Sequence, residues 1–150
     1  MPPQPSPDPG HDELSPDLLQ AIVEEACRKS SVLWLTYDGG ERPRPAWHIW
    51  ADGAAVVLVA RAPESAEQRL PGLTDAARAT VTCRAKDGRA RLIGWEARVE
   101  VVAPGTSAWD AAFAALRTER LNTTDLPTVG ERWAASDDIV RLVPAGEVTE

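Results

Sequence analysis

Two pairs of residues in this chain have the charge and hydroxyl groups that bind a phosphate. Arg61 and Ser65 stand at and just beyond the end of one predicted strand, and Arg84 and Lys86 share one face of another. A phosphate is held by convergent cations and hydroxyls, so these four residues predict an anion site if the fold brings them together. Taken singly, each charge is more typical of a solvated surface residue.

A second group, Trp47, His48 and Trp50, has the chemistry to hold a planar ring. Indole rings form a flat apolar wall, and an imidazole can donate a hydrogen bond or transfer a proton near neutral pH. Strand alternation puts Trp47 and Ile49 on one face and His48 and Trp50 on the other. The face with His48 is the candidate site, and a structural histidine with satisfied hydrogen bonds is the alternative.

Length and charge limit the possible functions. At 150 residues and 16.2 kDa the chain has room for one domain with a sizeable core. Its net charge of -7 opposes nucleic-acid binding, which depends on neutralised phosphates. No run of eighteen apolar residues occurs, and no basic leader precedes an apolar stretch. We therefore expect a cytoplasmic protein with no nucleic-acid or membrane partner.

Cysteine and histidine are too few and too scattered for a zinc site. The chain has two cysteines, Cys27 and Cys83, and two histidines, His11 and His48. We expect both cysteines to be small buried residues of a reduced protein, with a disulfide as the alternative. No metal site is predicted.

Antiparallel strands and two helices would position the candidate residues. Residues 1–14 predict a disordered Pro-rich tail, and residues 15–150 predict a single domain. Ser15 and Pro16 begin a helix that runs to about Lys29. The predicted strands are Val32 to Tyr37, Arg44 to Trp50, Ala54 to Ala60, Thr80 to Lys86, Arg89 to Val102 and Asp138 to Pro144. A second helix begins at Ser107, and Leu121 to Arg132 is a polar connection.

This order predicts a mainly β fold with flanking helices, built on a small six-stranded antiparallel barrel. It excludes a Rossmann fold, in which strands and helices alternate after a Gly-rich turn. Asp52-Gly53 marks a tight hairpin turn, and Gly94 marks a bulge or a close backbone approach. Side chains fill the interior of such small barrels, so a ligand is expected at a rim or between subunits.

The arrangement resembles the flavin-binding split barrels related to pyridoxamine 5'-phosphate oxidase, including their deazaflavin-using actinobacterial relatives. The resemblance spans Pro16 to Pro144. It is carried by the opening helix, the Val32 to Tyr37 strand, Arg44-Pro45-Ala46-Trp47-His48-Ile49-Trp50, the Asp52-Gly53 turn with Val56 to Arg61, and Thr80 to Lys86 with the long strand through Trp95.

The resemblance implies a homodimer that binds FMN at the subunit interface, or instead the deazaflavin F420 or haem. The function it implies is that of an oxidoreductase acting on a small molecule, with the hydride chemistry supplied by the cofactor. The residues placed at the cofactor are Trp47, His48, Trp50, Arg61, Ser65, Arg84 and Lys86. No side chain is assigned as an essential catalyst.

The chain departs from the family pattern after the third strand. Many relatives have a basic, hydroxyl-rich run there, whereas this chain has Glu64 and Glu67, which would repel a phosphate. The alternative function is therefore a split barrel that binds or sequesters haem or flavin without catalysis, with His48 as the core imidazole ligand to haem. A third hypothesis is a structural dimer with a Trp-rich interface.

Overall fold

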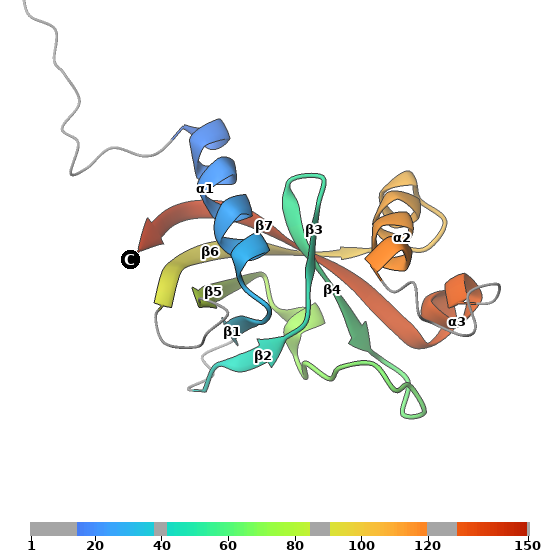
Figure 1. Ribbon diagram of the computed structural model, residues 1–150. Coiled ribbons are helices and arrows are strands. Elements are labelled where there is room, and N and C mark those ends of the chain that lie inside the picture. Colours follow the sequence, from blue (N-terminus) through green and yellow to red (C-terminus); the bar gives the residue numbers. More distant parts are fainter. Residues whose placement is uncertain (1–14, 38–41, 85–90, 120–128, 150) are drawn as a thin grey trace, which may run out of the picture.

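A single curved sheet of seven antiparallel strands dominates the computed structural model of this chain (Figure 1). The structure describes residues 15–37, 42–84, 91–119 and 129–149. The elements are α1 (Pro16–Lys29), β1 (Leu33–Tyr37), β2 (Arg44–Ala46), β3 (Ile49–Ala51), β4 (Ala54–Ala60), the short 3-10 helix η1 (Leu73–Asp75), β5 (Arg78–Arg84), β6 (Arg91–Val102), α2 (Ser107–Glu119), α3 (Val129–Ser136) and β7 (Asp137–Thr149). The mainly β, antiparallel architecture is confirmed.

The two outermost strands of the sheet are neighbours in the chain. The strand order is β2-β1-β5-β6-β7-β4-β3, and only Trp47 and His48 separate β2 from β3. The sheet therefore curls round so that its two edges meet at this corner. The prediction of six strands is wrong, because the segment from Arg44 to Trp50 forms two short strands with different partners, β1 and β4.

Gln68 replaces the missing strand partner at this corner. Its Oε1 accepts from Trp47 N at 2.7 Å, and its Nε2 donates to Trp47 O at 2.9 Å and to Leu58 O at 3.1 Å. The backbone carbonyl of Gln68 also accepts from Ala60 N at 2.8 Å. One side chain thus satisfies the backbone groups that a continuous ladder would have paired.

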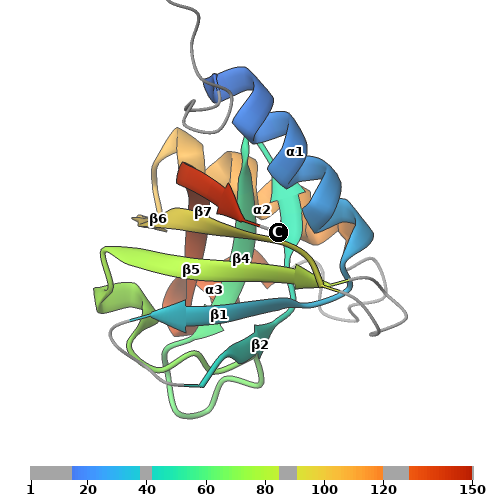
Figure 2. The same ribbon diagram turned by 90° about the vertical axis from the view of Figure 1, so that its left-hand side faces the viewer.

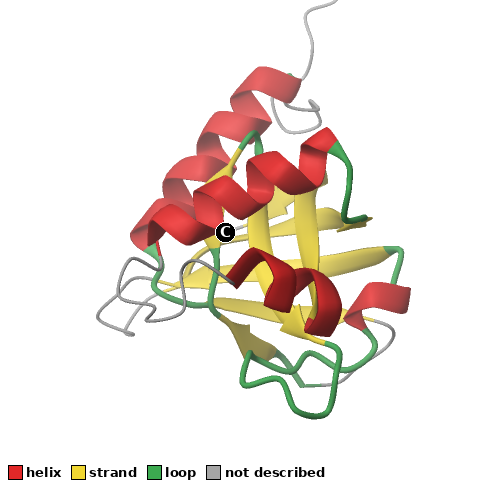
Figure 3. Ribbon diagram, turned by 90° about the vertical axis from the view of Figure 1, so that its right-hand side faces the viewer, coloured by secondary structure: helices red, strands yellow, loops and turns green. Residues whose placement is uncertain are grey.

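Two hydrophobic cores lie on opposite sides of the sheet. The inner core is enclosed by the curled sheet and α1 and includes Leu33, Leu35, Val57, Val81 and Trp95. The outer core lies under α2 and α3 and includes Val56, Leu58, Leu116, Trp133 and Ile139. Figure 3 shows α2 and α3 over this side of the sheet. Strand β4 supplies residues to both cores, which explains why its first six residues are all buried.

Helix α1 begins and ends where the sequence predicts. The Ser15 side chain accepts from Leu18 N at 3.2 Å, and Pro16 occupies the first turn. Val23 and Ala26 face the inner core. The opposite side of the helix is solvated.

Helix α2 begins at Ser107, as the sequence predicts, and the preceding Thr106 caps it, because its Oγ1 accepts from Trp109 N at 3.2 Å. The third helix differs from the prediction. Helix α3 was not predicted, and it buries Trp133 against Phe113 at a ring separation of 5.6 Å. Gly130 permits this approach, since a Cβ there would lie 3.1 Å from the Phe113 ring.

Strand β7 is longer than predicted and contains a bulge opposite Glu96, where the β6–β7 register shifts between Trp95 and Ala97. Gly94 pairs in register with Thr82 and Thr149, so the bulge predicted at Gly94 itself is not there. The extra β7 residues include Gly146, whose φ of 88° favours glycine. The predicted turn at Asp52 is confirmed, with φ of 50° there and 80° at Gly53.

Some predictions fall on residues outside the described ranges. These are the tail at 1–14, Lys86, the turn at 87–88 and most of the predicted connection at 121–132. Within the described ranges, every helix is too short or too polar to cross a lipid bilayer.

Candidate functional site

His48 lies under the end of α1, where it holds the helix to the sheet. Its Nε2 lies 2.9 Å from Cys27 O, one of the last carbonyls of the helix. A carbonyl only accepts, so Nε2 carries the proton. Nδ1 is buried without a hydrogen-bond partner among the described residues. Burial lowers the pKa of His48, and the hydrogen bond to Cys27 opposes this shift. The structure therefore gives His48 a structural role through Nε2, although Nδ1 lacks the partner that the prediction of a satisfied histidine requires.

The two tryptophans beside His48 point in opposite directions. Trp47 packs against the outer core and Trp50 against the inner core. The predicted alternation is confirmed, but the face with His48 and Trp50 points into the barrel. The expectation that this face presents a binding surface is therefore wrong for a single chain. Period-two alternation separates the faces without saying which one is covered.

Arg61 is held by internal partners. Its Nε donates to Asp138 Oδ1 at 3.2 Å, and its Nη2 donates to Ala134 O at 3.0 Å and Asp137 O at 3.5 Å. The acceptors belong to the end of α3 and the start of β7. Arg61 thus fastens the junction between these elements and already has a carboxylate partner.

Ser65 is also bound, to the buried carboxylate of Asp137. Its Oγ donates to Asp137 Oδ1, and the same Oγ accepts from Glu67 N at 3.1 Å. Burial raises the pKa of Asp137; the Ser65 hydrogen bond opposes this, and the nearby Glu67 adds to it. This loop is acidic and internally paired, so it does not fit a flavin phosphate.

Arg84 lies far from Arg61 within one chain. Arg84 pairs with Arg91 at the start of β6, whereas Arg61 follows Ala60, which pairs with Asp137 near the other end of β6. The 12 residues of β6 span about 36 Å between their ends. The expected convergence of the two arginines within one subunit is therefore wrong. They can meet only across two subunits.

Arg84 lies instead beside an accessible aromatic ring. Its guanidinium carbon lies 5.8 Å from the centre of the Trp34 ring, and no carboxylate pairs with it among the described residues. Trp34 is half-buried. In the sheet register Trp34 lies between Pro45 and Thr82, and Gly94 is the next residue across. These neighbours are small, so they leave the Trp34 indole accessible beside the Arg84 guanidinium.

We call this surface the open face, defined by Trp34, Thr80, Thr82, Arg84, Glu96 and Arg98 on β1, β5 and β6. Thr80 donates to Glu96 at 2.7 Å, and Arg98 lies 3.5 Å from Glu100. Figure 2 shows these strands toward the viewer, with α2 and α3 behind the sheet. No described helix covers the open face, so this part of the outer side of the sheet can receive a ligand or a partner.

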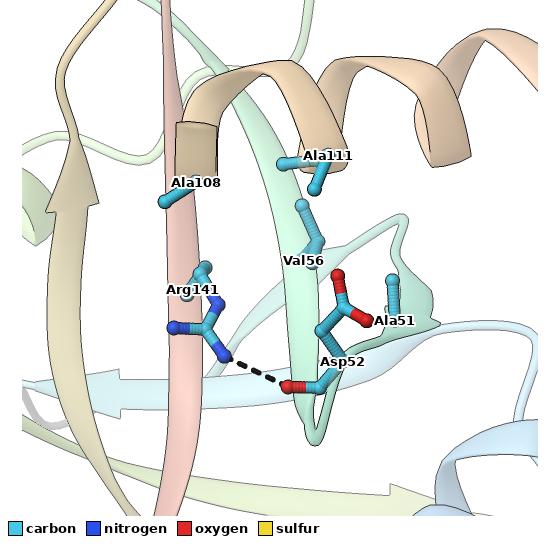
Figure 4. A pocket seen from close by; sticks show the side chains of 7 residues that line it. Ala51, Asp52, Val56, Ala108, Ala111 and Arg141 are labelled. Atoms are coloured by element: carbon cyan, nitrogen blue, oxygen red, sulfur yellow. Dashed lines mark hydrogen bonds between the residues drawn. The ribbon is translucent and has the colours of Figure 1, made fainter. Parts of the chain in front are cut away.

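A small pocket lies further along the same outer face of the sheet, between α2 and the β3–β4 turn. It has a volume of about 150 Å³ and is lined by Ala51, Asp52, Val56, Ala108, Ala111, Ala112 and Arg141. Arg141 donates to Asp52 O at 2.9 Å (Figure 4). It also donates to Glu100 Oε1 at 2.6 Å. Sites for larger organic ligands occupy about 300–1,000 Å³, so this pocket does not fit a flavin.

The cysteines and Gln68 have roles that sequence reasoning missed. Cys27 and Cys83 are both free and buried, as expected, but their sulfurs lie 3.9 Å apart. Their separation of 56 residues in the chain hides this contact. Gln68 looks like an ordinary polar loop residue in the sequence. In the described part of the chain, no three His, Cys, Asp or Glu side chains gather as a metal site requires.

The chain matches no protein-family model, and no curated protein matches it in sequence. It is similar to solved structures. A conserved hypothetical protein from Mycobacterium tuberculosis has a TM-score of 0.59 at 16% identity, covering 85% of this chain and 81% of that one. HutZ, the haem storage protein from Vibrio cholerae, has 0.55 at 15% identity, with 87% and 92% covered.

A third similar structure is a putative pyridoxamine 5'-phosphate oxidase from Listeria innocua. Its TM-score is 0.52 at 14% identity, covering 89% of this chain and 94% of that one. Identities this low establish the fold alone. The coverage is nearly complete in both directions, so the whole arrangement of elements is shared. The chain therefore has the split-barrel fold of the pyridoxamine 5'-phosphate oxidase-like proteins.

Proposed function

We propose that this protein is a homodimeric split-barrel oxidoreductase that binds a flavin, FMN or a deazaflavin, at the open face. The observation that carries the proposal is the Arg84–Trp34 pair, a cation without a carboxylate partner among the described residues beside an accessible indole. The fold supports it, because a similar structure is a putative pyridoxamine 5'-phosphate oxidase. The substrate class is a small organic molecule that accepts or donates a hydride.

The residues of the open face fit the two parts of a flavin. Arg84 would bind the phosphate, with Lys86 two residues further along the chain as a second cation. The Trp34 ring would lie against the planar ring system. Thr80 and Thr82 add hydroxyls on the same face. The flavin would supply the hydride chemistry, while these side chains bind and orient it.

This assignment departs from the sequence prediction at Arg61 and Ser65. Both are committed to Asp137, Asp138 or the end of α3, and a phosphate would have to displace a carboxylate from Arg61. We therefore assign these two residues to the stability of the β4–β7 junction. Trp47, His48 and Trp50 likewise support the corner between β2 and β3.

Titration with FMN, riboflavin and the deazaflavin tests the proposal. We expect saturable fluorescence quenching and a rise in melting temperature, since a ligand at 100 times its Kd stabilises the native state by about 2.7 kcal/mol. Arg84→Ala should weaken FMN binding about 10- to 100-fold and leave riboflavin, which has no phosphate, almost unchanged.

Arg117→Ala is the matched control. Arg117 also lies 5.8 Å from an aromatic ring, that of Phe113, but on α2 and far from the open face. FMN affinity should be unchanged in this variant. Equal losses in the Arg84 and Arg117 variants, or no binding of any flavin at micromolar concentration, would overturn the proposal.

A second candidate function is haem binding without catalysis. The likeness to HutZ, a haem storage protein, favours it. Haem absorption bands in the freshly purified protein would support it, whereas reduction of an acceptor above the free-flavin background would support the oxidoreductase. His48→Ala should retain any haem bound, because His48 Nε2 already bonds to Cys27 O.

A further inference from the structure

The two cysteines of this chain form a buried pair beneath the end of α1. Cys27 lies in the last turn of α1, and Cys83 is the penultimate residue of β5. Their sulfurs are 3.9 Å apart, close to van der Waals contact, and the exposed fractions of the two residues are 1% and 0%. Two thiols from segments 56 residues apart thus face each other inside the barrel.

The surroundings of the pair make the two sulfurs unequal. Trp95 Nε1 donates to Cys83 Sγ at 3.4 Å, which stabilises negative charge on this sulfur. The hydrogen bond from Cys27 lowers the pKa of the Cys83 thiol, and that from Trp95 acts in the same direction. The same Cys27–Cys83 interaction, together with burial, raises the pKa of the Cys27 thiol. Cys83 is therefore the nucleophilic partner and Cys27 the thiol that reacts second.

The backbone around Cys27 holds the pair in place. His48 Nε2 and Ser30 N bond to Cys27 O at 2.9 and 3.2 Å, and Ser30 Oγ donates to Ala26 O at 2.9 Å. These bonds fix the last turn of α1 over β5. A covalent link between the two sulfurs would need them to close from 3.9 Å to the disulfide bond length of about 2.05 Å.

We propose that Cys27 and Cys83 form a dithiol site that hydrogen peroxide oxidises to an intrachain disulfide, which fastens α1 to β5. The Cys83 thiolate attacks a peroxide oxygen, so an S–O bond forms, the O–O bond breaks and water leaves after protonation. The Cys27 sulfur then attacks Cys83 Sγ. The S–S bond forms, the S–O bond breaks, and a second water leaves with the Cys27 proton.

The electrons balance in this sequence. The two thiols lose two electrons and two protons, and one hydrogen peroxide is reduced to two waters. Because both sulfurs are buried, the reaction waits for a local opening of the α1 end, whose solvent side carries only exposed pairs such as Arg28 with Glu24. Oxidation is therefore slow and depends on α1 stability.

The test is oxidation of the full native chain by hydrogen peroxide, followed by mass spectrometry. We expect the loss of two hydrogens, a linked peptide pair holding Cys27 and Cys83, and no free thiol after denaturation. The chain has only two cysteines, so no other intrachain disulfide is possible. The melting temperature should rise by about 5–10 °C and return on treatment with dithiothreitol.

Two variants keep the result specific. Cys27→Ala removes the second thiol, so Cys83 should stop at oxidised monothiol forms and gain no thermal stability. Ser15→Ala removes the N-cap of α1, leaves both thiols in place, and should speed disulfide formation several-fold. Persistence of both thiols in the oxidised sample, disulfide-linked dimers in place of the intrachain link, or a lower melting temperature after oxidation would each overturn the proposal.

Discussion

At the scale of single residues, burial decides what His48 does, and the sequence could not show burial. The chain order Trp47, His48, Ile49, Trp50 predicted which residues share a face. It did not tell which face lies against α1, because the contact with Cys27, 21 residues earlier in the chain, depends on how the sheet curls. Arg61 and Ser65 were likewise predicted by type, while their partners Asp137 and Asp138 lie more than 70 residues away.

The buried state of His48 predicts a pH dependence of stability. Its pKa is lowered in the folded protein, so the unfolded chain, with an ordinary value of 6.5, binds the proton more readily. The stabilising contribution is complete above about pH 6.5 and is lost as pH falls toward the folded pKa. The loss is at most about 1.4 kcal/mol per pH unit, the limit for one proton.

Urea unfolding between pH 7.5 and 5 measures this effect. His48→Gln, which keeps a donor but does not titrate, should have a shallower dependence than the wild type. The raised pKa of Asp137 acts in the opposite direction, favouring the folded state as pH falls, and cancels when the two proteins are compared. His11→Gln, the other histidine, is the control and should keep the wild-type slope. Parallel curves for all three proteins would contradict the prediction.

At the scale of elements, the sequence predicted correctly those features that depend on interactions between neighbouring residues. The N-cap at Ser15, the Asp52-Gly53 turn and strand β4 all follow from neighbouring residues, and all are confirmed. Helix α3 was missed because Gly130 is typical of a loop. Its reason is tertiary, since the Phe113 ring packs where a Cβ would stand. The break between β2 and β3 was missed for the same kind of reason.

Replacing Gln68 tests how much its side chain stabilises the corner between β2 and β3. Gln68→Ala would leave the N–H and carbonyl of Trp47 and the carbonyl of Leu58 without their side-chain partner. We expect a loss of about 2–4 kcal/mol in the free energy of unfolding, because unpaired buried polar groups cost more than an average hydrogen bond contributes. Chemical denaturation measures it.

Gln20→Ala is the matched control for this change. Gln20 makes one exposed hydrogen bond, from its Nε2 to Gly53 O at 3.2 Å. Its removal should change stability by less than about 0.5 kcal/mol. Similar losses in the two variants would show that Gln68 is an ordinary loop residue.

At the scale of the whole molecule, helices cover the sheet unevenly. Helix α1 closes the inner core, α2 and α3 cover the outer core, and the open face has no described helix (Figures 2 and 3). Arg84 and Trp34 therefore lie on the side where a second subunit could approach without displacing a helix. The open face can therefore hold the proposed cofactor and also form the interface of the proposed homodimer.

Ligand binding and dimerisation are linked when the ligand binds between two subunits. If dimerisation raises the affinity for the ligand by some factor, the ligand raises the affinity of the subunits for each other by the same factor. We expect FMN to tighten the dimer about tenfold, measured by sedimentation at a protein concentration near the dimer Kd. Arg84→Ala should remove this effect, and Arg117→Ala should retain it. Raising the salt concentration should weaken the effect of FMN more than that of riboflavin, because only FMN brings a phosphate to Arg84. If FMN binds but the dimer Kd does not change, the cofactor lies within one subunit. The proposed flavin site would then stand without the proposed site between subunits.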